Sequence, residues 1–142
     1  MIRQRLRSLL TMDGTPRGIA GGFALGLSLS LVPIPFAGMV LALALAPFLR
    51  CNLPATYVGT AVVNPFTGAF FYAAELWIGM RLVGLAPPRF AELRALDASG
   101  WWALFQEMIV PFAIGATTLV IVALAIVFPL VYLLVARVRR SS

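Results

Sequence analysis

Several polar side chains occur inside or beside apolar runs, where a polar group is costly unless it has a role. Asn64 and Thr67 stand close together in the middle of the chain, and Glu75 is the only acid inside an apolar run. Arg17 and Arg50 bound the first long apolar run. Ionisable groups at membrane depth usually mark substrate or proton pathways. We therefore treat these five as candidate substrate-binding residues, with the arginines attracting an anionic group, Asn64 and Thr67 lining a turn, and Glu75 coupling a proton.

Glu75 also has a structural interpretation. On a helix, Arg81 is too far along the sequence from Glu75 for the usual pairing, so any partner must come from another segment. An interfacial acid at the end of a tilted helix, near Trp77, fits the same pattern. Both interpretations stay open at the level of sequence.

The residue types exclude most enzyme chemistry. The chain has no histidine and one cysteine, Cys51, and its five acids are scattered. Metal sites and nucleophilic catalysis need clustered His, Cys or acidic side chains. The sequence therefore predicts no catalytic residue, no metal and no cofactor, and we do not expect an enzyme.

The composition is that of a membrane protein. Of the 142 residues, 61% are hydrophobic and 11% are charged, whereas soluble domains are about 25% charged. The stretches 18–49 and 108–136 contain no charge. We expect one membrane domain over residues 14–142, preceded by a basic amphipathic segment over residues 1–13. So small a domain encloses little space, which favours a homo-oligomer.

The basic residues are all arginines, and most of them lie near the ends of the chain. The end clusters are Arg3, Arg5, Arg7 and Arg17, and Arg137, Arg139 and Arg140. Such flanks indicate the cytoplasmic side and attract anionic lipid headgroups. We expect a multi-pass protein with both termini in the cytoplasm and with membrane lipids as partners. Nucleic acid is not an expected partner, because the chain has no base-reading motif.

Two apolar runs are each broken near their middle by proline. The run 18–49 would be ~48 Å long as a straight helix, but the hydrocarbon core of a bilayer is only about 30 Å thick. The run 53–83 is broken in the same way. The expected turn or hinge residues are Pro33, Pro35, Gly38, Pro65 and Gly68.

These patterns predict an all-α membrane protein with four parts. They are a hairpin over 16–50, a second hairpin over 53–84, an interfacial amphipathic helix over 88–107 and a transmembrane helix over 109–136. The arms of the hairpins are too short to span a bilayer comfortably. Re-entrant hairpins are therefore expected, and two tilted crossings are the alternative. With both termini in the cytoplasm, the first hairpin returns at Arg50, the broken second hairpin crosses once and the last helix returns. If both hairpins were re-entrant, the C-terminal arginines would lie outside.

The first arm carries glycines at intervals of four. Gly18, Gly22 and Gly26 fall on one helical face, which lets another backbone come close. We assign this face to packing inside the first hairpin rather than to a dimer.

A set of short motifs occurs in a fixed order along the chain. They are Gly14–Ala20, Gly22–Gly26, Val32–Pro35, Leu49–Ala55, Gly59-Thr60 and Asn64–Thr67. Together they resemble the DUF2062 family of small bacterial membrane proteins, over residues 14–136. The resemblance implies an integral protein of the bacterial cytoplasmic (inner) membrane. Related domains can be joined to glycosyltransferases that act on lipid-linked sugars, which implies a connection to envelope lipids.

Two functions of different classes fit these observations. Broken helices in corresponding positions point to a transport site near the bilayer midplane, so the first is transport or flipping of a small anionic or lipid-linked substrate. The alternative is a non-catalytic membrane scaffold or accessory protein for an envelope-lipid or glycosyltransferase system, with Trp101 and Trp102 docking a partner. A membrane enzyme is the weakest option, because histidine and clustered acids are missing.

Overall fold

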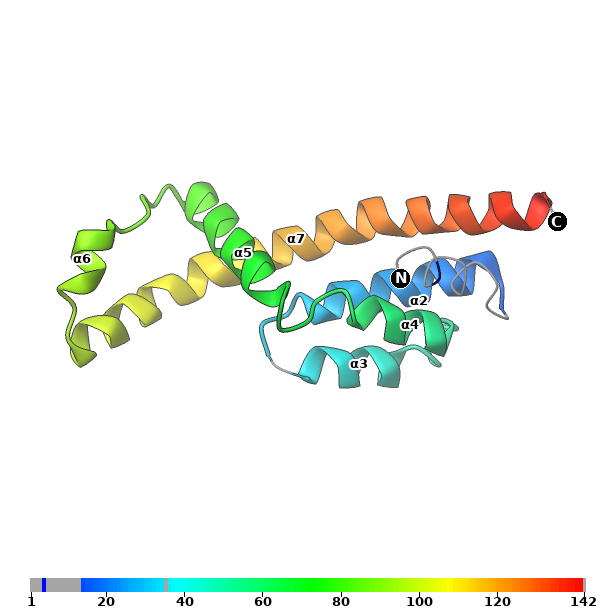
Figure 1. The fold of residues 1–142 in the computed structure, drawn as a ribbon, viewed down its shortest axis with the longest axis horizontal. Coiled ribbons are helices and arrows are strands. Elements are labelled where there is room, and N and C mark those ends of the chain that lie inside the picture. Colours follow the sequence, from blue (N-terminus) through cyan, green and yellow to red (C-terminus); the bar gives the residue numbers. More distant parts are fainter. Residues whose placement is uncertain (1–3, 5–13, 35, 142) are drawn as a thin grey trace.

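The fold is entirely helical in the part of the chain that the computed structural model describes, which is residue 4 and residues 14–34 and 36–141. The helices shown in Figure 1 are α2 (Pro16–Ser30), α3 (Ala37–Leu45), α4 (Leu53–Thr60), α5 (Gly68–Val83), α6 (Phe90–Arg94) and α7 (Ala98–Arg140). The predicted all-α class is confirmed over these residues. The expected segment 1–13, apart from residue 4, and the expected hinge residue Pro35 lie outside them.

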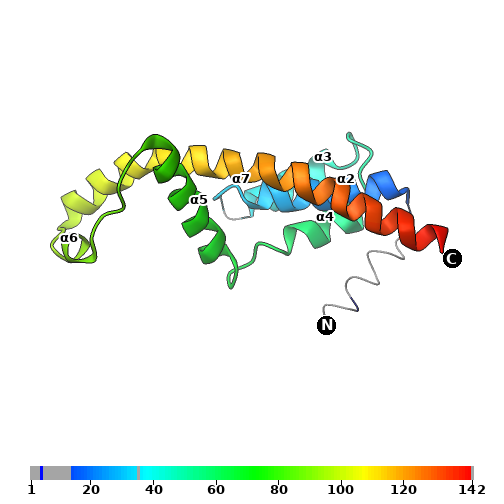
Figure 2. The ribbon, with the colours of Figure 1, turned by 90° about the horizontal axis from the view of Figure 1, so that it is seen from above.

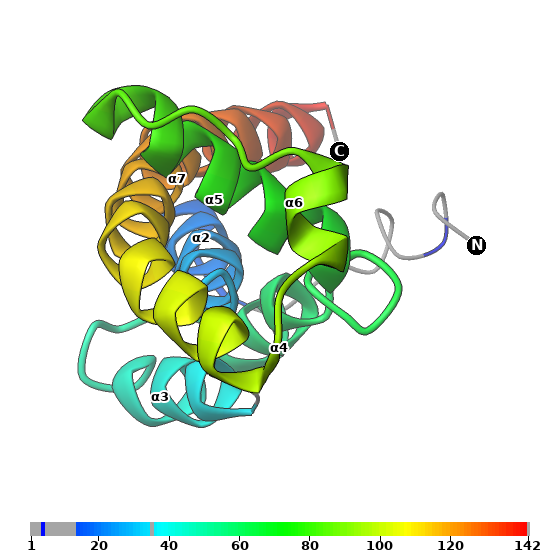
Figure 3. The same ribbon diagram turned by 90° about the vertical axis from the view of Figure 1, so that its left-hand side faces the viewer.

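The longest helix, α7, runs the length of the molecule, and the other helices pack along it in two groups. α2 lies beside the C-terminal half of α7, and α4 and α3 pack against α2 (Figures 1 and 2). α5 crosses the N-terminal half of α7, and α6 lies beyond that crossing (Figure 1). Seen end-on, α3 and α5 lie on opposite edges of the molecule (Figure 3). The chain therefore has two packing units joined by one helix.

The first unit has a small core built from three helices. Ile19 of α2, Ala55 of α4 and Val135 of α7 are fully buried against one another. Because Ile19 is near the start of α2 and Val135 is near the end of α7, these two helix ends lie at the same end of the molecule (Figure 1).

The glycine face of α2 packs against α4. A side chain added at Gly26 would collide with the Thr56 backbone, and one added at Gly59 would collide with the backbone of Phe23. Gly22 likewise faces α4, with Thr56 Oγ1 2.8 Å from the position of an added Cβ. The predicted packing within the chain is found, but the partner is α4 rather than the second arm of the hairpin, α3. Two short helices can touch at backbone level only where side chains are this small.

Polar caps fix where α2 and α4 begin in the first unit. Thr15 Oγ1 accepts a hydrogen bond from the Gly18 N–H at 3.0 Å at the start of α2. Asn52 Oδ1 accepts one from the Ala55 N–H at 2.9 Å at the start of α4. The Asn52 N–H in turn donates to the Gly18 carbonyl at 2.9 Å, which ties the two caps together.

The second expected hairpin does not form as a packed pair. α5 packs across α7 instead of returning against α4. At the crossing, a side chain added at Gly79 would collide with the Pro111 backbone, and one added at Gly115 would collide with that of Glu75. The small residues of α5 therefore match small residues of α7, a pairing that sequence spacing within 53–84 could not reveal.

The C-terminal segment differs from the expected division into an interfacial helix over 88–107 and a transmembrane helix over 109–136. α6 has only 5 residues, whereas α7 has 43 residues and is about 65 Å long. Pro111 lies inside α7, and the helix continues through it. A proline removes one helical hydrogen bond and favours a kink, but tertiary packing can offset this cost. The start of α7 is capped by Asp97, where the Gly100 N–H at 2.8 Å and the Ser99 hydroxyl hold the pKa of the carboxyl below its ordinary value.

α7 is also the one helix in the described residues that is long and apolar enough to cross a membrane. Almost none of its most apolar window is buried by the rest of the protein. A core helix of a soluble protein would be covered on most sides, so these exposed apolar side chains fit a lipid environment. The structure thus supports association with a membrane through α7.

Candidate functional site

The two proline breaks, far apart in sequence, face a common cavity. We call it the turn cavity; its volume is about 400 Å³. The first break contributes Ile34, Phe36 and Gly38, and the second contributes Asn64, Pro65 and Gly68. Other walls come from α2, α4 and α5, and they include Ser30, Tyr57, Thr60 and Tyr72. None of the described residues that line the turn cavity is charged.

The second break satisfies its own polar groups. Asn64 Oδ1 accepts hydrogen bonds from the N–H groups of Phe66 at 2.9 Å and Thr67 at 3.2 Å. The Gly68 N–H donates to the Asn64 carbonyl at 2.6 Å. Pro65 has no N–H, and each N–H from Phe66 to Gly68 has an acceptor within the turn.

The Thr67 hydroxyl completes this turn. It accepts a hydrogen bond from the Asn64 N–H at 3.0 Å and donates one to the Val62 carbonyl at 2.6 Å. The Asn64 amide Nδ2 donates to the Ala61 carbonyl at 3.2 Å. Irregular backbone at membrane depth is tolerated only where its polar groups are satisfied. Asn64 and Thr67 therefore hold the wall of the cavity in shape, and much of their hydrogen-bonding capacity is used in doing so.

The first break is bent differently. Phe36 has a left-handed backbone with φ of 62° and caps α3 without a side-chain hydrogen bond. Two residues later, a side chain added at Gly38 would collide with the carbonyl of Leu29. Because α3 approaches α2 this closely, the chain reverses sharply and Phe36, which is 80% exposed, is left at the cavity edge.

A second hollow adjoins the turn cavity. This apolar groove has a volume of about 780 Å³ and lies between the first break, α5 and α7. Its walls are almost wholly apolar, and they include Val32, Pro33, Leu76, Phe105, Phe112 and Val120. Ile34 lines both hollows and so forms the boundary between them.

The two candidate arginines lie together, but away from both hollows. Gly18, next to Arg17, packs at the Arg50 carbonyl, with 3.4 Å from an added Cβ to that oxygen. The 8 residues of α4, about 12 Å of helix, separate Arg50 from the second break. Arg137 and Arg140 end α7 at the same end of the molecule (Figure 1). Arg17, Arg50, Arg137 and Arg140 thus lie at one end of the molecule, which we call the basic end. Neither Arg17 nor Arg50 lines a hollow.

Glu75 occupies a third position, inside the crossing of α5 and α7. It has no exposed surface, and neither carboxyl oxygen has a hydrogen-bond partner among the described residues. It lines neither hollow itself, but Tyr72 on one side of it lines the turn cavity and Leu76 on the other lines the groove. The five predicted site residues thus occupy three places and not one.

Sequence reasoning missed four hydroxyl-bearing residues of the turn cavity. They are Ser30, Tyr57, Thr60 and Tyr72, and they come from three helices. Only Thr60 had a local signal, because it follows Thr56 by one helical turn in an otherwise apolar arm.

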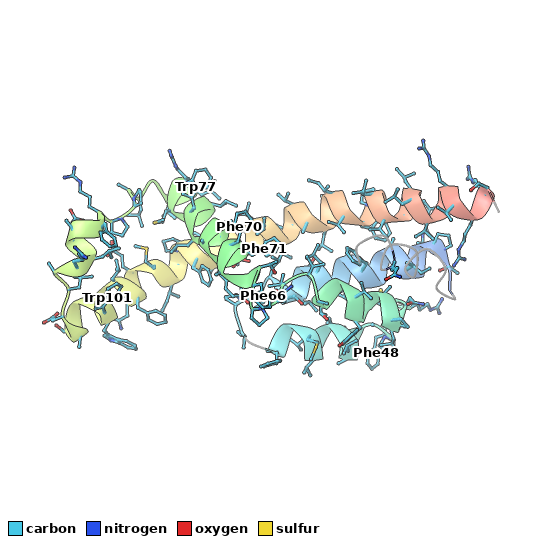
Figure 4. All side chains as sticks on the ribbon, in the orientation of Figure 1. Phe48, Phe66, Phe70, Phe71, Trp77 and Trp101 are labelled. Carbon is cyan, nitrogen blue, oxygen red and sulfur yellow. The ribbon has the colours of Figure 1, made fainter. Side chains whose placement is uncertain are left out.

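One group of exposed aromatic side chains lies at the opposite end of the molecule from the basic end. Trp101 and Trp102 at the start of α7 are 50% and 61% exposed, and Phe90 of α6 is 72% exposed. Trp102 stacks on Phe105, with their ring centroids 5.7 Å apart. Figure 4 shows Trp101 beside α6, far from Phe48, which lies between α3 and α4.

One comparison with known proteins gives a match. A family model described as "Uncharacterized protein conserved in bacteria (DUF2062)" matches residues 1–142. No curated protein and no solved structure matches the chain.

Proposed function

The chain belongs to the DUF2062 family, and from that premise we propose that it binds an amphipathic membrane lipid or lipid-linked molecule and moves it across the bilayer. The observation that carries this proposal is the pair of adjoining hollows. One has hydroxyl and amide side chains among its apolar lining, the other is almost wholly apolar, and Ile34 forms their common edge.

The sizes and linings of the hollows suit the two parts of a lipid. Ligand pockets usually have volumes of about 300–1,000 Å³, and both hollows fall in that range. An acyl or isoprenoid chain gains by leaving water for the apolar groove. A polar headgroup gains hydrogen bonds from the hydroxyl groups of the turn cavity. Since no charged side chain lines that cavity, we assign the attraction of an anionic group to the basic end instead.

The arrangement of the helices supports a re-entrant first hairpin within this proposal. α2 has 15 residues and α3 has 9, so they are about 22 and 14 Å long. Both are shorter than the hydrocarbon core of about 30 Å. We propose that they enter from the cytoplasmic side of the inner membrane, that α4 and α5 together cross it, and that α7 returns. Both termini then lie in the cytoplasm with the basic end.

A lipid-transfer assay tests the proposal. The full chain is reconstituted in vesicles that contain headgroup-labelled phosphatidylglycerol or phosphatidylethanolamine, and a membrane-impermeant quencher reports labelled lipid that reaches the outer leaflet. We expect faster quenching than in protein-free vesicles, and Ile34→Trp should return the rate to the protein-free value because it fills the shared edge. Leu41→Trp is the matched control, since Leu41 is 52% exposed on α3 and lines neither hollow.

The second candidate function is a scaffold for envelope-lipid or glycosyltransferase proteins, and a failure of lipid transfer favours it. The observation behind it is the exposed aromatic end formed by Phe90, Trp101 and Trp102. If both lipid probes move no faster than without protein, or if Ile34→Trp keeps the wild-type rate, transfer through the paired hollows is contradicted. Replacing Trp101 and Trp102 by alanine then becomes the decisive change, because a docking surface depends on such aromatic anchors.

A further inference from the structure

Glu75 differs from the other described acids in its surroundings. Glu92, Asp97 and Glu107 are exposed, whereas Glu75 has no exposed surface. Both of its carboxyl oxygens lack a hydrogen-bond partner in the described part of the chain. A buried charge without a partner is one of the most costly arrangements in a protein. The packing therefore favours the neutral, protonated acid.

The elements around Glu75 offer no compensating charge. α7 carries no charged residue between Glu107, which is exposed, and Arg137 at its end. On α5, Arg81 stacks over the ring of Trp77, with 5.2 Å from the guanidinium carbon to the ring centroid.

The remaining neighbours lead to the same conclusion. Tyr72, one turn earlier on α5, is the nearest titratable residue in sequence, and its ring packs edge-on to Phe112 with centroids 6.3 Å apart. α2 beyond its first turn and all of α3 contain no charged residue, since none occurs between Arg17 and Arg50.

A metal ion does not explain the site. Metal ions such as Ca²⁺ need several oxygen ligands, and no group of three metal-ligating side chains exists among the described residues. A lone buried carboxyl is suited to hold a proton.

The crossing itself makes the protonation state consequential. Gly115 of α7 lies against the backbone of Glu75, and Gly79, one turn later on α5, lies against the backbone of Pro111. The two helices thus touch at backbone level at Glu75 itself and one turn later. A charge formed there has no room for water unless the helices separate.

We propose that Glu75 is a proton-binding site whose neutral form holds α5 against α7, and that loss of the proton to solvent water loosens this crossing. Tyr72 lines the turn cavity, Leu76 lines the apolar groove, and Glu75 lies between them on α5. Loosening of the crossing therefore opens the wall that α5 contributes to both hollows. The inference stands on the crossing alone and does not depend on lipid transfer.

Infrared spectroscopy of the full chain in vesicles reads the proton directly. At neutral pH we expect the carbonyl band of a protonated carboxylic acid in the wild type and in Glu107→Gln, but not in Glu75→Gln. Glu107→Gln is the matched control because it removes an exposed acid from the adjoining helix. A wild-type spectrum without that band overturns the proposal, whatever the result of the lipid-transfer assay.

Distances across the crossing test its mechanical part. Spin labels are placed at Ala73 of α5 and Ala113 of α7, which are both exposed, in a Cys51→Ser background. We expect the label-to-label distance to lengthen by several ångströms as the pH is raised, and Glu75→Gln to keep the short distance throughout. If Glu75→Gln follows the wild-type response, Glu75 is not the switch. If that variant fails to insert, an unchanged wild-type distance from acid to alkaline pH still overturns the proposal.

Discussion

At the scale of the residue, a polar side chain can hold the wall of a site in shape instead of contacting a ligand. Asn64 and Thr67 look like ligand-binding groups in the sequence, but most of their hydrogen bonds close the turn between α4 and α5. Glu75 is the reverse case, because no described residue forms a hydrogen bond with its carboxyl group. A polar residue in an apolar run is thus a functional signal only once its partners are known.

The Thr67 hydroxyl gives a direct test of this structural role. Thr67→Val removes a donor to Val62 and an acceptor for the Asn64 N–H, and unsatisfied groups of this kind cost about 1–3 kcal/mol each. We expect the free energy of unfolding in detergent to fall by at least about 1–3 kcal/mol, the cost of one such group.

Thr117→Val is the matched control for Thr67→Val. The Thr117 hydroxyl donates to the Ala113 carbonyl within α7, and its removal leaves the helical backbone bonds in place, so the change should be within ~0.5 kcal/mol. Equal losses in the two variants would show that the turn is not held by Thr67.

At the scale of the element, small residues decide which helices pair. α2 meets α4 through Gly26 and Gly59, and α5 meets α7 through Gly79 and Gly115. Each contact joins two backbones, where a single methyl group has no space. Pairing by small residues is the usual way that helices associate in membranes, because lipid removes the hydrophobic driving force between them.

Gly26→Ala should separate α2 from α4. The new Cβ would collide with the Thr56 carbonyl, and overpacking of this kind costs about 1–3 kcal/mol. We expect a lower thermal midpoint in detergent. Gly68→Ala is the control, since its Cβ would meet only Tyr72 Cε2 at 3.6 Å, an ordinary contact. A larger loss for Gly68→Ala than for Gly26→Ala would contradict the assigned pairing.

At the scale of the whole molecule, the two ends differ in composition, but neither is purely basic or purely aromatic. Phe48, two residues before Arg50, is 85% exposed, and Arg89 and Arg94 lie at the two ends of α6. The start of α2, the loop before α4 and the end of α7 form the basic end, and α6 with the start of α7 forms the aromatic end (Figure 1). Arginine clusters favour the cytoplasmic side and aromatic residues favour the interfaces. Our proposal that the basic end faces the cytoplasm rests on this difference between the two ends.

Thiol labelling of the two ends checks this direction. Cys51 lies beside the basic end, and Ala91 of α6 is exposed near the aromatic end. In intact cells, a membrane-impermeant reagent should label Ala91→Cys in a Cys51→Ser background but should not label native Cys51. In inverted vesicles the pattern should reverse. Labelling of both positions from one side would contradict an α7 that crosses the membrane.

The sequence by itself determined the all-α class, the apolar C-terminal helix and the two breaks, because proline, glycine and hydropathy act over a few neighbouring residues. It could not determine which helices pair, since that depends on the fit of small residues such as Gly26 and Gly79 to backbones far along the chain. Only the tertiary structure placed both breaks around one cavity, kept Arg17 away from it and buried Glu75 with no hydrogen-bond partner in the described part of the chain. These relations exist between surfaces, and surfaces form only when the helices have packed.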